Sequence, residues 1–134
     1  MNVMFDINVV LDIVGHRHPF YETSRDALLK VIEDGDSPCL SVHALSTLYY
    51  LLGAAPTRKQ RSAAMDWALG TFEIAGLTAD DVKVARDLPM PDFEDALVVA
   101  AAAAARCNCI LTRNVRDFRG SPIRAVLPAD YVQS

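Results

Sequence analysis

The stretch from residue 92 to residue 118 constrains the fold more than any other part of this chain. It reads DFEDALVVAAAAAARCNCILTRNVRDF, so three carboxylates are followed by an apolar helix, a short apolar strand and a second polar cluster. A helix that is apolar on nearly all sides is a buried helix, and its alanines let a sheet approach closely. We therefore predict that the acidic start of this helix and the polar end of the strand lie at one edge of a sheet.

The rest of the chain alternates short apolar strands with helices. Strands are predicted at residues 2–5, 38–41, 72–75 and 109–112, with a possible edge strand at 123–127. Helices are predicted after Asp6 as far as Gly15, over 20–33, from Ser41 to before Pro56, over 57–70 and 78–88, and from Asp92 onward. This alternation is typical of an α/β fold with a parallel sheet, here of four to five strands, covered on both faces. We predict a single domain over residues 1–134.

Acidic residues follow or precede the strands at positions that are distant in sequence. Asp6 ends the first strand, Asn114 and Asp117 follow the fourth, and Asp95 begins the helix that leads into the fourth. Ligands of parallel sheets collect at the carboxyl ends of the strands, so these side chains are predicted to meet there. Carboxylates gathered in a buried place are costly unless a positive group joins them.

The bulk properties exclude several classes of protein. The chain is 51% hydrophobic and 22% charged, has a net charge of −4, and contains three cysteines. No apolar run approaches the ~20 residues that span a bilayer, and no signal peptide is visible. A net negative charge argues against a protein that coats nucleic acid through a broad basic surface. We expect a cytoplasmic protein without a membrane segment.

Four ordered segments of the chain together resemble the PIN-domain family, and within it the VapC-like toxins. They are DINVVLD after the first strand, SVHALSTLYYLL in the middle, DFEDAL before the alanine-rich helix, and ILTRNVRDF after it. The resemblance implies a three-layer α/β/α fold and a ribonuclease that depends on Mg²⁺ or Mn²⁺. Many members of the family are toxins of bacterial toxin–antitoxin pairs, so RNA, a small antitoxin and a second copy of the chain are the partners it implies.

The acids of the family map onto this chain with departures. The first acid falls on Asp6 and the third on Asp95, whereas the fourth falls on Asn114, with Asp117 three residues further on as a substitute. These four residues are the predicted catalytic group. The second acid falls on Thr47, which carries no charge.

Asp92 is an additional acid, and the predicted metal ligands are Asp6, Asp92, Asp95 and Asp117. Mg²⁺ keeps several waters and needs only one or two carboxylates, so one ion between Asp6 and Asp95 is predicted in place of a two-metal site. The alternative is a catalytically weakened PIN fold that binds RNA or a protein.

Three residues at or after the end of the fourth strand are predicted to contact RNA: Thr112, Arg113 and Arg116. Arginine forms charge-assisted hydrogen bonds with phosphate, although an ordinary solvated charge is the plain alternative.

Other residues of the candidate site also have plain structural interpretations. Asp6 and Asp92 could be helix caps, Asp12 a solvated helix charge, and His43 a surface residue. Thr47 could bond the backbone of its own helix.

Overall fold

The computed structural model of the chain describes residues 1–53 and 57–134. The strands are β1 (Asn2–Phe5), β2 (Ser37–Ser41), β3 (Glu73–Ala75), β4 (Cys107–Leu111) and β5 (Ala125–Val126). The helices are α1 (Ile7–Val14), α2 (Tyr21–Glu33), α3 (Val42–Leu51), α4 (Arg58–Thr71), α5 (Ala79–Asp87), α6 (Phe93–Ala104) and α7 (Pro128–Gln133), with a 3-10 turn η1 (Val115–Phe118). The predicted helix boundary at Pro56 lies outside the described residues.

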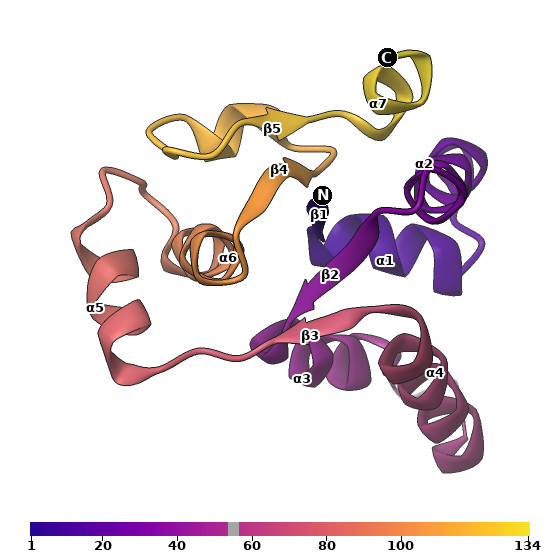
Figure 1. Ribbon diagram of the computed structural model, residues 1–134. Coiled ribbons are helices and arrows are strands. Elements are labelled where there is room, and N and C mark those ends of the chain that lie inside the picture. Colours follow the sequence, from indigo (N-terminus) through magenta and orange to yellow (C-terminus); the bar gives the residue numbers. More distant parts are fainter. Residues whose placement is uncertain (54–56) are drawn as a thin grey trace.

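The five strands form one parallel sheet in the order β3-β2-β1-β4-β5 (Figure 1). This confirms the predicted α/β class and the parallel sheet of four to five strands. The chain builds the sheet outward from β1 to β3, then returns to the other side of β1 with β4 and β5. The order therefore reverses between β1 and β4, which is where open parallel sheets bind ligands.

Helices cover both faces of the sheet because successive residues of a strand point to opposite sides. Val3 and Phe5 pack with residues of α1, α2 and α3, whereas Met4 between them packs with Val98 and Val99 of α6. In Figure 1, α5 and α6 lie on one side of the sheet and α1 and α2 on the other. The three-layer α/β/α architecture is thus confirmed.

The alanine-rich helix α6 is buried on two sides. Val98, Val99 and their neighbours face the sheet, while Ala96 and Ala100 contact Ala85 of α5. The small side chains allow α6 to lie between a sheet and a second helix, as predicted for a helix that is apolar all round. Its last turn is an exception, because Ala103 and Ala104 are exposed.

Strand β4 differs from its prediction. It begins at Cys107, two residues early, and its register against β1 shifts so that Asn2 pairs with Cys107 but Val3 pairs with Cys109. A bulge of this kind inserts one residue into a strand, and the two cysteines consequently pack on opposite faces of the sheet. Thr112 follows the strand and is fully buried.

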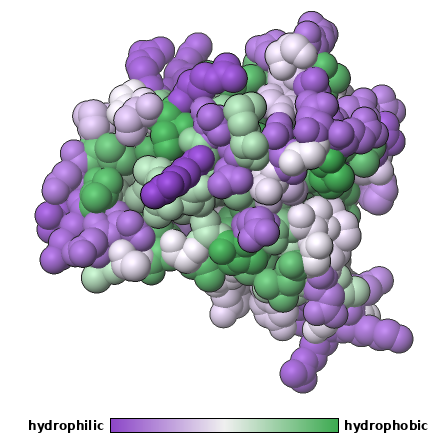
Figure 2. All heavy atoms as spheres, in the orientation of Figure 1, coloured by the Kyte–Doolittle hydropathy of each residue, from purple (hydrophilic) through white to green (hydrophobic). Residues whose placement is uncertain are grey.

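The surface seen in Figure 2 alternates between hydrophobic areas and hydrophilic side chains. None of the helices in the described part of the chain has both the length and the apolar character that a membrane crossing requires.

Candidate active site

Asp6 lies at the point where the strand order reverses. Its backbone N–H donates to the carbonyl of Leu111 at 2.9 Å, so β1 and β4 end side by side. Its side chain is only 3% exposed and accepts two hydrogen bonds of 2.8 Å, from the Ile7 N–H and from Thr112 Oγ1. Asp6 is therefore the N-cap of α1, which agrees with the structural role considered for it from the sequence. Each carboxylate oxygen keeps a further lone pair for another contact.

Burial raises the pKa of Asp6 above its ordinary value. The hydrogen bonds from Thr112 and Ile7 act in the opposite direction, as does the positive charge of Arg113, whereas the negative charge of Asp117 raises the pKa further. The carboxylate of Asp6 is thus an electrostatically strained anion that a nearby cation would stabilise.

Asp95 is half-buried in the first turn of α6 and faces the same negative charges. Burial together with the charges of Asp92, Asp6, Asp117 and Glu94 raises the pKa of Asp95 to about 7. The charges of Asp92, Asp6 and Asp117 thus act on Asp95, and a common metal site of these four acids stays a prediction.

Asp6 and Asp95 line the same small cavity. Its volume is about 20 Å³, and its lining comprises Asp6, Ile7, His43, Ala44, Thr47, Glu94, Asp95 and Val98. A space of roughly 10–15 Å³ already holds one water molecule. The cavity therefore fits one water or one ion.

His43 and Thr47 of α3 form the wall of this cavity where the family has its second acid. Thr47 Oγ1 donates to the His43 carbonyl at 3.2 Å, so its hydroxyl bonds its own helix. His43 is half-buried, which corrects the expected surface position, and its Nδ1 is buried without a hydrogen-bond partner among the described residues. Burial lowers the pKa of His43, although the Glu94 charge and the Glu94 backbone carbonyl oppose this shift.

Other predicted site residues are exposed and do not line this cavity. Asp92 caps α6, since its Oδ1 accepts from the Asp95 N–H at 3.0 Å. Asn114 donates its N–H to Thr112 Oγ1 at 3.0 Å. Asp117 and Arg116 are exposed on η1. Their solvent-exposed acidic, amide and basic groups are free of the core.

Arg113 does not project freely toward solvent. Its Nε and Nη2 donate to the two carboxylate oxygens of Asp12 at 2.7 and 3.3 Å, and its guanidinium lies 4.0 Å from the ring centroid of Phe20. Asp12 is 0% exposed and also accepts from Ser24 Oγ at 3.2 Å. The expectation that Asp12 is a solvated charge is wrong. A single carboxylate within the apolar helix INVVLDIV indicates that this side chain is buried and paired, although it does not identify the partner.

The donor set suits one hard divalent cation with few protein ligands. Among residues 1–53 and 57–134, no group of three or more His, Cys, Asp or Glu side chains is arranged to hold a metal ion. Two repelling carboxylates beside a cavity of one-ion size still match Mg²⁺ or Mn²⁺, because such ions bind through one or two carboxylates and retain water. Asp6 and Asp95 would be direct ligands, and Asp92 and Asp117 would act through water.

The raised pKa of Asp95 predicts how stability depends on pH. Its pKa rises from 3.8 to about 7 on folding, so the folded chain holds this proton more tightly. The stability of the metal-free protein should therefore fall as pH rises from about 4 to 7. Asp95→Asn should reduce this fall, as measured by urea unfolding at pH 5 and pH 8 in chelator. Asp80→Asn, at a side chain 93% exposed, is the control and should unfold like wild type. Equal pH dependence in wild type and Asp95→Asn would contradict the assignment.

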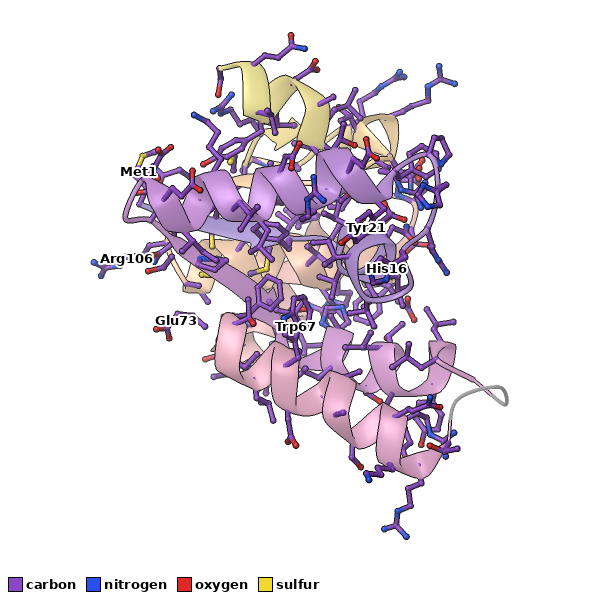
Figure 3. All side chains as sticks on the ribbon, turned by 90° about the vertical axis from the view of Figure 1, so that its right-hand side faces the viewer. Met1, His16, Tyr21, Trp67, Glu73 and Arg106 are labelled. Atoms are coloured by element: carbon purple, nitrogen blue, oxygen red, sulfur yellow. The ribbon has the colours of Figure 1, made fainter. Side chains whose placement is uncertain are left out.

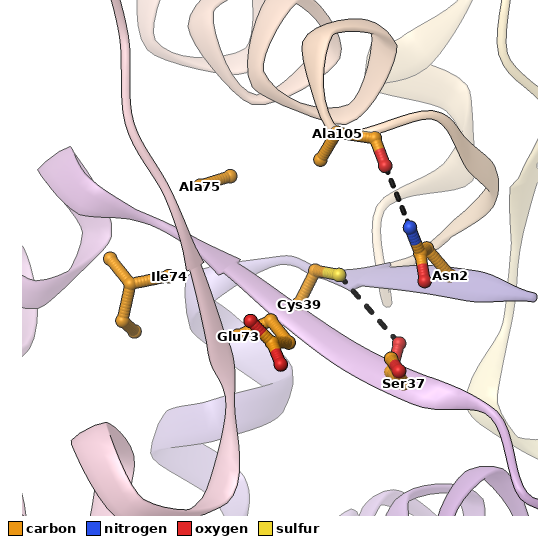
Figure 4. A pocket seen from close by; sticks show the side chains of 7 residues that line it. All are labelled: Asn2, Ser37, Cys39, Glu73, Ile74, Ala75 and Ala105. Atoms are coloured by element: carbon orange, nitrogen blue, oxygen red, sulfur yellow. Dashed lines mark hydrogen bonds between the residues drawn. The ribbon is translucent and has the colours of Figure 1, made fainter.

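Larger cavities lie elsewhere on the molecule. A cavity of about 300 Å³ lies at the amino ends of the strands, where Asn2 Nδ2 donates to the Ala105 carbonyl (Figure 4). An apolar groove of about 390 Å³ has His16 and Tyr21 on one side and Trp67 of α4 on the other (Figure 3). The small cavity between Asp6 and Asp95 remains the candidate active site.

Comparisons with known proteins agree on the fold. A family model described as PIN domain matches residues 2–116. Among curated proteins no match is found. The solved structure of VapBC from Salmonella typhimurium bound to DNA is similar with a TM-score of 0.74 and 17% identity, covering 96% of this chain and 98% of that chain.

Two further structures are similar over nearly the full length. VapBC2 from Rickettsia felis, bound to a DNA fragment from its promoter, has a TM-score of 0.72, 18% identity, and coverage of 95% and 98% of the two chains. FitAcB from Neisseria gonorrhoeae has a TM-score of 0.69, 15% identity, and coverage of 94% and 97%. At these identities the likeness concerns the fold.

Proposed function

Since this chain belongs to the PIN domain family, we propose that it is a metal-dependent endoribonuclease, the toxin of a toxin–antitoxin pair. The observation that carries the proposal is the pairing of Asp6 and Asp95 across a one-ion cavity, where burial and neighbouring acids raise the pKa of Asp95 to about 7. Two carboxylates that repel each other in a small buried space have their charge balanced when a divalent cation joins them.

The residues of the site have separate roles in this proposal. Asp6 and Asp95 bind Mg²⁺ or Mn²⁺, and Thr112 holds Asp6 in place through its hydroxyl. When bound, the ion supplies a water of lowered pKa as nucleophile and stabilises charge at the phosphodiester. Asp117 replaces the acid missing at Asn114, and the exposure of both side chains leaves them accessible to a substrate.

Substrate binding is assigned to an exposed arginine after β4. Arg116 on η1 is exposed and available for an RNA phosphate. Arg113 is committed to Asp12, so we assign Arg116 the larger share of phosphate binding.

Incubation of RNA with the purified protein in Mg²⁺, Mn²⁺ or chelator tests the proposal. Cleavage should require the divalent ion and should disappear in Asp95→Asn. Cleavage by Asp95→Asn at the wild-type rate would contradict the assigned site.

Binding of the ion should stabilise the fold. A ligand that binds only the folded form at a hundredfold excess over its Kd contributes about 2.7 kcal/mol. Thermal unfolding should therefore shift upward in Mn²⁺ for wild type and should not shift for Asp6→Asn/Asp95→Asn. An equal shift in both proteins would place the ion elsewhere.

The partners are also part of the proposal. Two of the similar structures are VapBC assemblies, which supports an antitoxin as partner of this chain. Tyr50 and Leu51 near the end of α3 are 75% and 55% exposed, which supports a homodimer that covers them. Light scattering at increasing protein concentration measures the dimer directly, and a constant monomer mass would contradict it.

The second candidate is a PIN fold that has lost its chemistry and binds RNA or a protein. It is favoured by Thr47, whose uncharged side chain replaces an acid and bonds its own helix. RNA binding without cleavage, unchanged by metal ions, would establish this candidate in place of the nuclease.

A further inference from the structure

Asp12 and Arg113 form a buried ion pair that joins the first helix to the loop after β4. Two hydrogen bonds connect them in bidentate geometry, Ser24 Oγ donates to the same carboxylate, and the guanidinium stacks on Phe20. Asp12 is fully buried, and the Arg113 side chain is 23% exposed. A planar guanidinium with this many partners has a fixed position.

This arginine also lies within electrostatic range of the active site. Arg113 follows Thr112, the residue that donates to Asp6, and its charge lowers the pKa of Asp6. Asp6 caps α1 and Asp12 lies in its second half, six residues on, which corresponds to about 9 Å along a helix. The charge of Arg113 thus acts on the carboxylate of Asp6, while Asp12 holds the guanidinium by direct contact.

We propose that Asp12 is a positioning residue that keeps the Arg113 guanidinium away from Asp6, so that the Asp6 carboxylate stays available for a divalent cation. This inference rests on the proposed function of the acidic site. A guanidinium that bridged to Asp6 would neutralise the carboxylate and compete with the cation, because both bind the same oxygens. The pair therefore acts on the site through charge, beyond holding the loop to the helix.

Calorimetric titration of Mn²⁺ into three proteins tests the inference. Asp12→Asn removes the charge that holds Arg113 and should weaken Mn²⁺ binding at least ~10-fold, the range typical of residues that support metal ligands. Asp12→Asn/Arg113→Gln removes the competing arginine as well, and its Mn²⁺ affinity should return to within about threefold of wild type. If the ion pair only stabilised the fold, Asp12→Asn/Arg113→Gln would bind Mn²⁺ no better than Asp12→Asn.

Two outcomes of the titration overturn the inference: wild-type affinity in Asp12→Asn, or affinity lost equally in the single and double variants. The test is the contrast between the single and the double variant, so if Asp12→Asn folds poorly, Asp12→Ser and Asp12→Ser/Arg113→Gln take the place of the two proteins.

A crystal structure of Asp12→Asn without metal gives a second readout that does not depend on metal binding. Arg113 within ion-pair distance of Asp6 supports the inference, and Arg113 still against position 12 refutes it. If wild type binds no Mn²⁺, the proposed function fails. The location of Arg113 in the crystal structure of Asp12→Asn still decides whether Asp12 keeps Arg113 away from Asp6.

Discussion

Replacing Asp6 by asparagine should reduce metal-dependent RNA cleavage by more than ~100-fold. Loss of residues that merely support metal ligands typically costs 10–100-fold, and Asp6 is assigned as a direct ligand. The amide keeps one oxygen for the Ile7 N–H that Asp6 now caps at 2.8 Å. Because burial raises the pKa of Asp6, its charge is disfavoured in the fold, and a neutral side chain should not destabilise the protein.

Initial cleavage rates in Mn²⁺, together with circular dichroism, measure the effect of Asp6→Asn. Asp87→Asn is the matched control, because Asp87 lies at the end of α5 with a side chain 69% exposed. Its rate should equal that of wild type. A folded Asp6→Asn protein that retained wild-type cleavage would remove Asp6 from the mechanism.

Replacing Arg113 by methionine should lower the free energy of unfolding by about 3–5 kcal/mol. This is the typical cost of removing one partner of a buried ion pair, since the remaining charge stays buried without compensation. Here the remaining charge is Asp12, which is 0% exposed and, among residues 1–53 and 57–134, would keep only the Ser24 hydroxyl as a side-chain donor. Methionine preserves most of the apolar contact with Phe20. The loss in free energy of unfolding therefore measures the contribution of the Arg113 charge.

Urea unfolding at neutral pH measures this loss. Arg86→Met is the matched control, since Arg86 and Asp87 pair at 3.0 Å with side chains 66% and 69% exposed. Exposed pairs contribute about 0–1 kcal/mol, so this variant should remain near wild type. Asp12→Asn/Arg113→Gln should recover most of the stability, because no charge is left unpaired. A loss below about 1 kcal/mol for Arg113→Met would show that the pair does not support the fold.

The layered fold could be predicted because its signals are local. The alternation of strands and helices specifies a parallel sheet, and the alanine-rich helix specifies an element covered on two sides. Boundaries were less accurate, because the bulge in β4 depends on pairing with β1 and leaves no mark in the sequence of either strand. The same holds for β5, where only Ala125 and Val126 pair.

The acidic site could be predicted in part for a related reason. Asp6 and Asp95 lie at the ends of local elements, and a parallel sheet brings such ends together. Asp12 could not be interpreted correctly, because its partner Arg113 lies 101 residues away. Thr112 could be marked as a polar residue at a strand end, but its hydrogen bond to Asp6 depends on how β1 and β4 align. The burial of His43 Nδ1 likewise depends on residues distant in sequence, such as Glu94, which acts on His43 from α6.

Calorimetric titration of Mn²⁺ into wild type and into Asp6→Asn/Asp95→Asn at neutral pH measures whether these two carboxylates bind one divalent cation in the cavity that both line. We predict one ion per chain in wild type and no binding in the folded double variant. Binding that persists in the double variant, or its absence in wild type at millimolar Mn²⁺, would contradict this prediction.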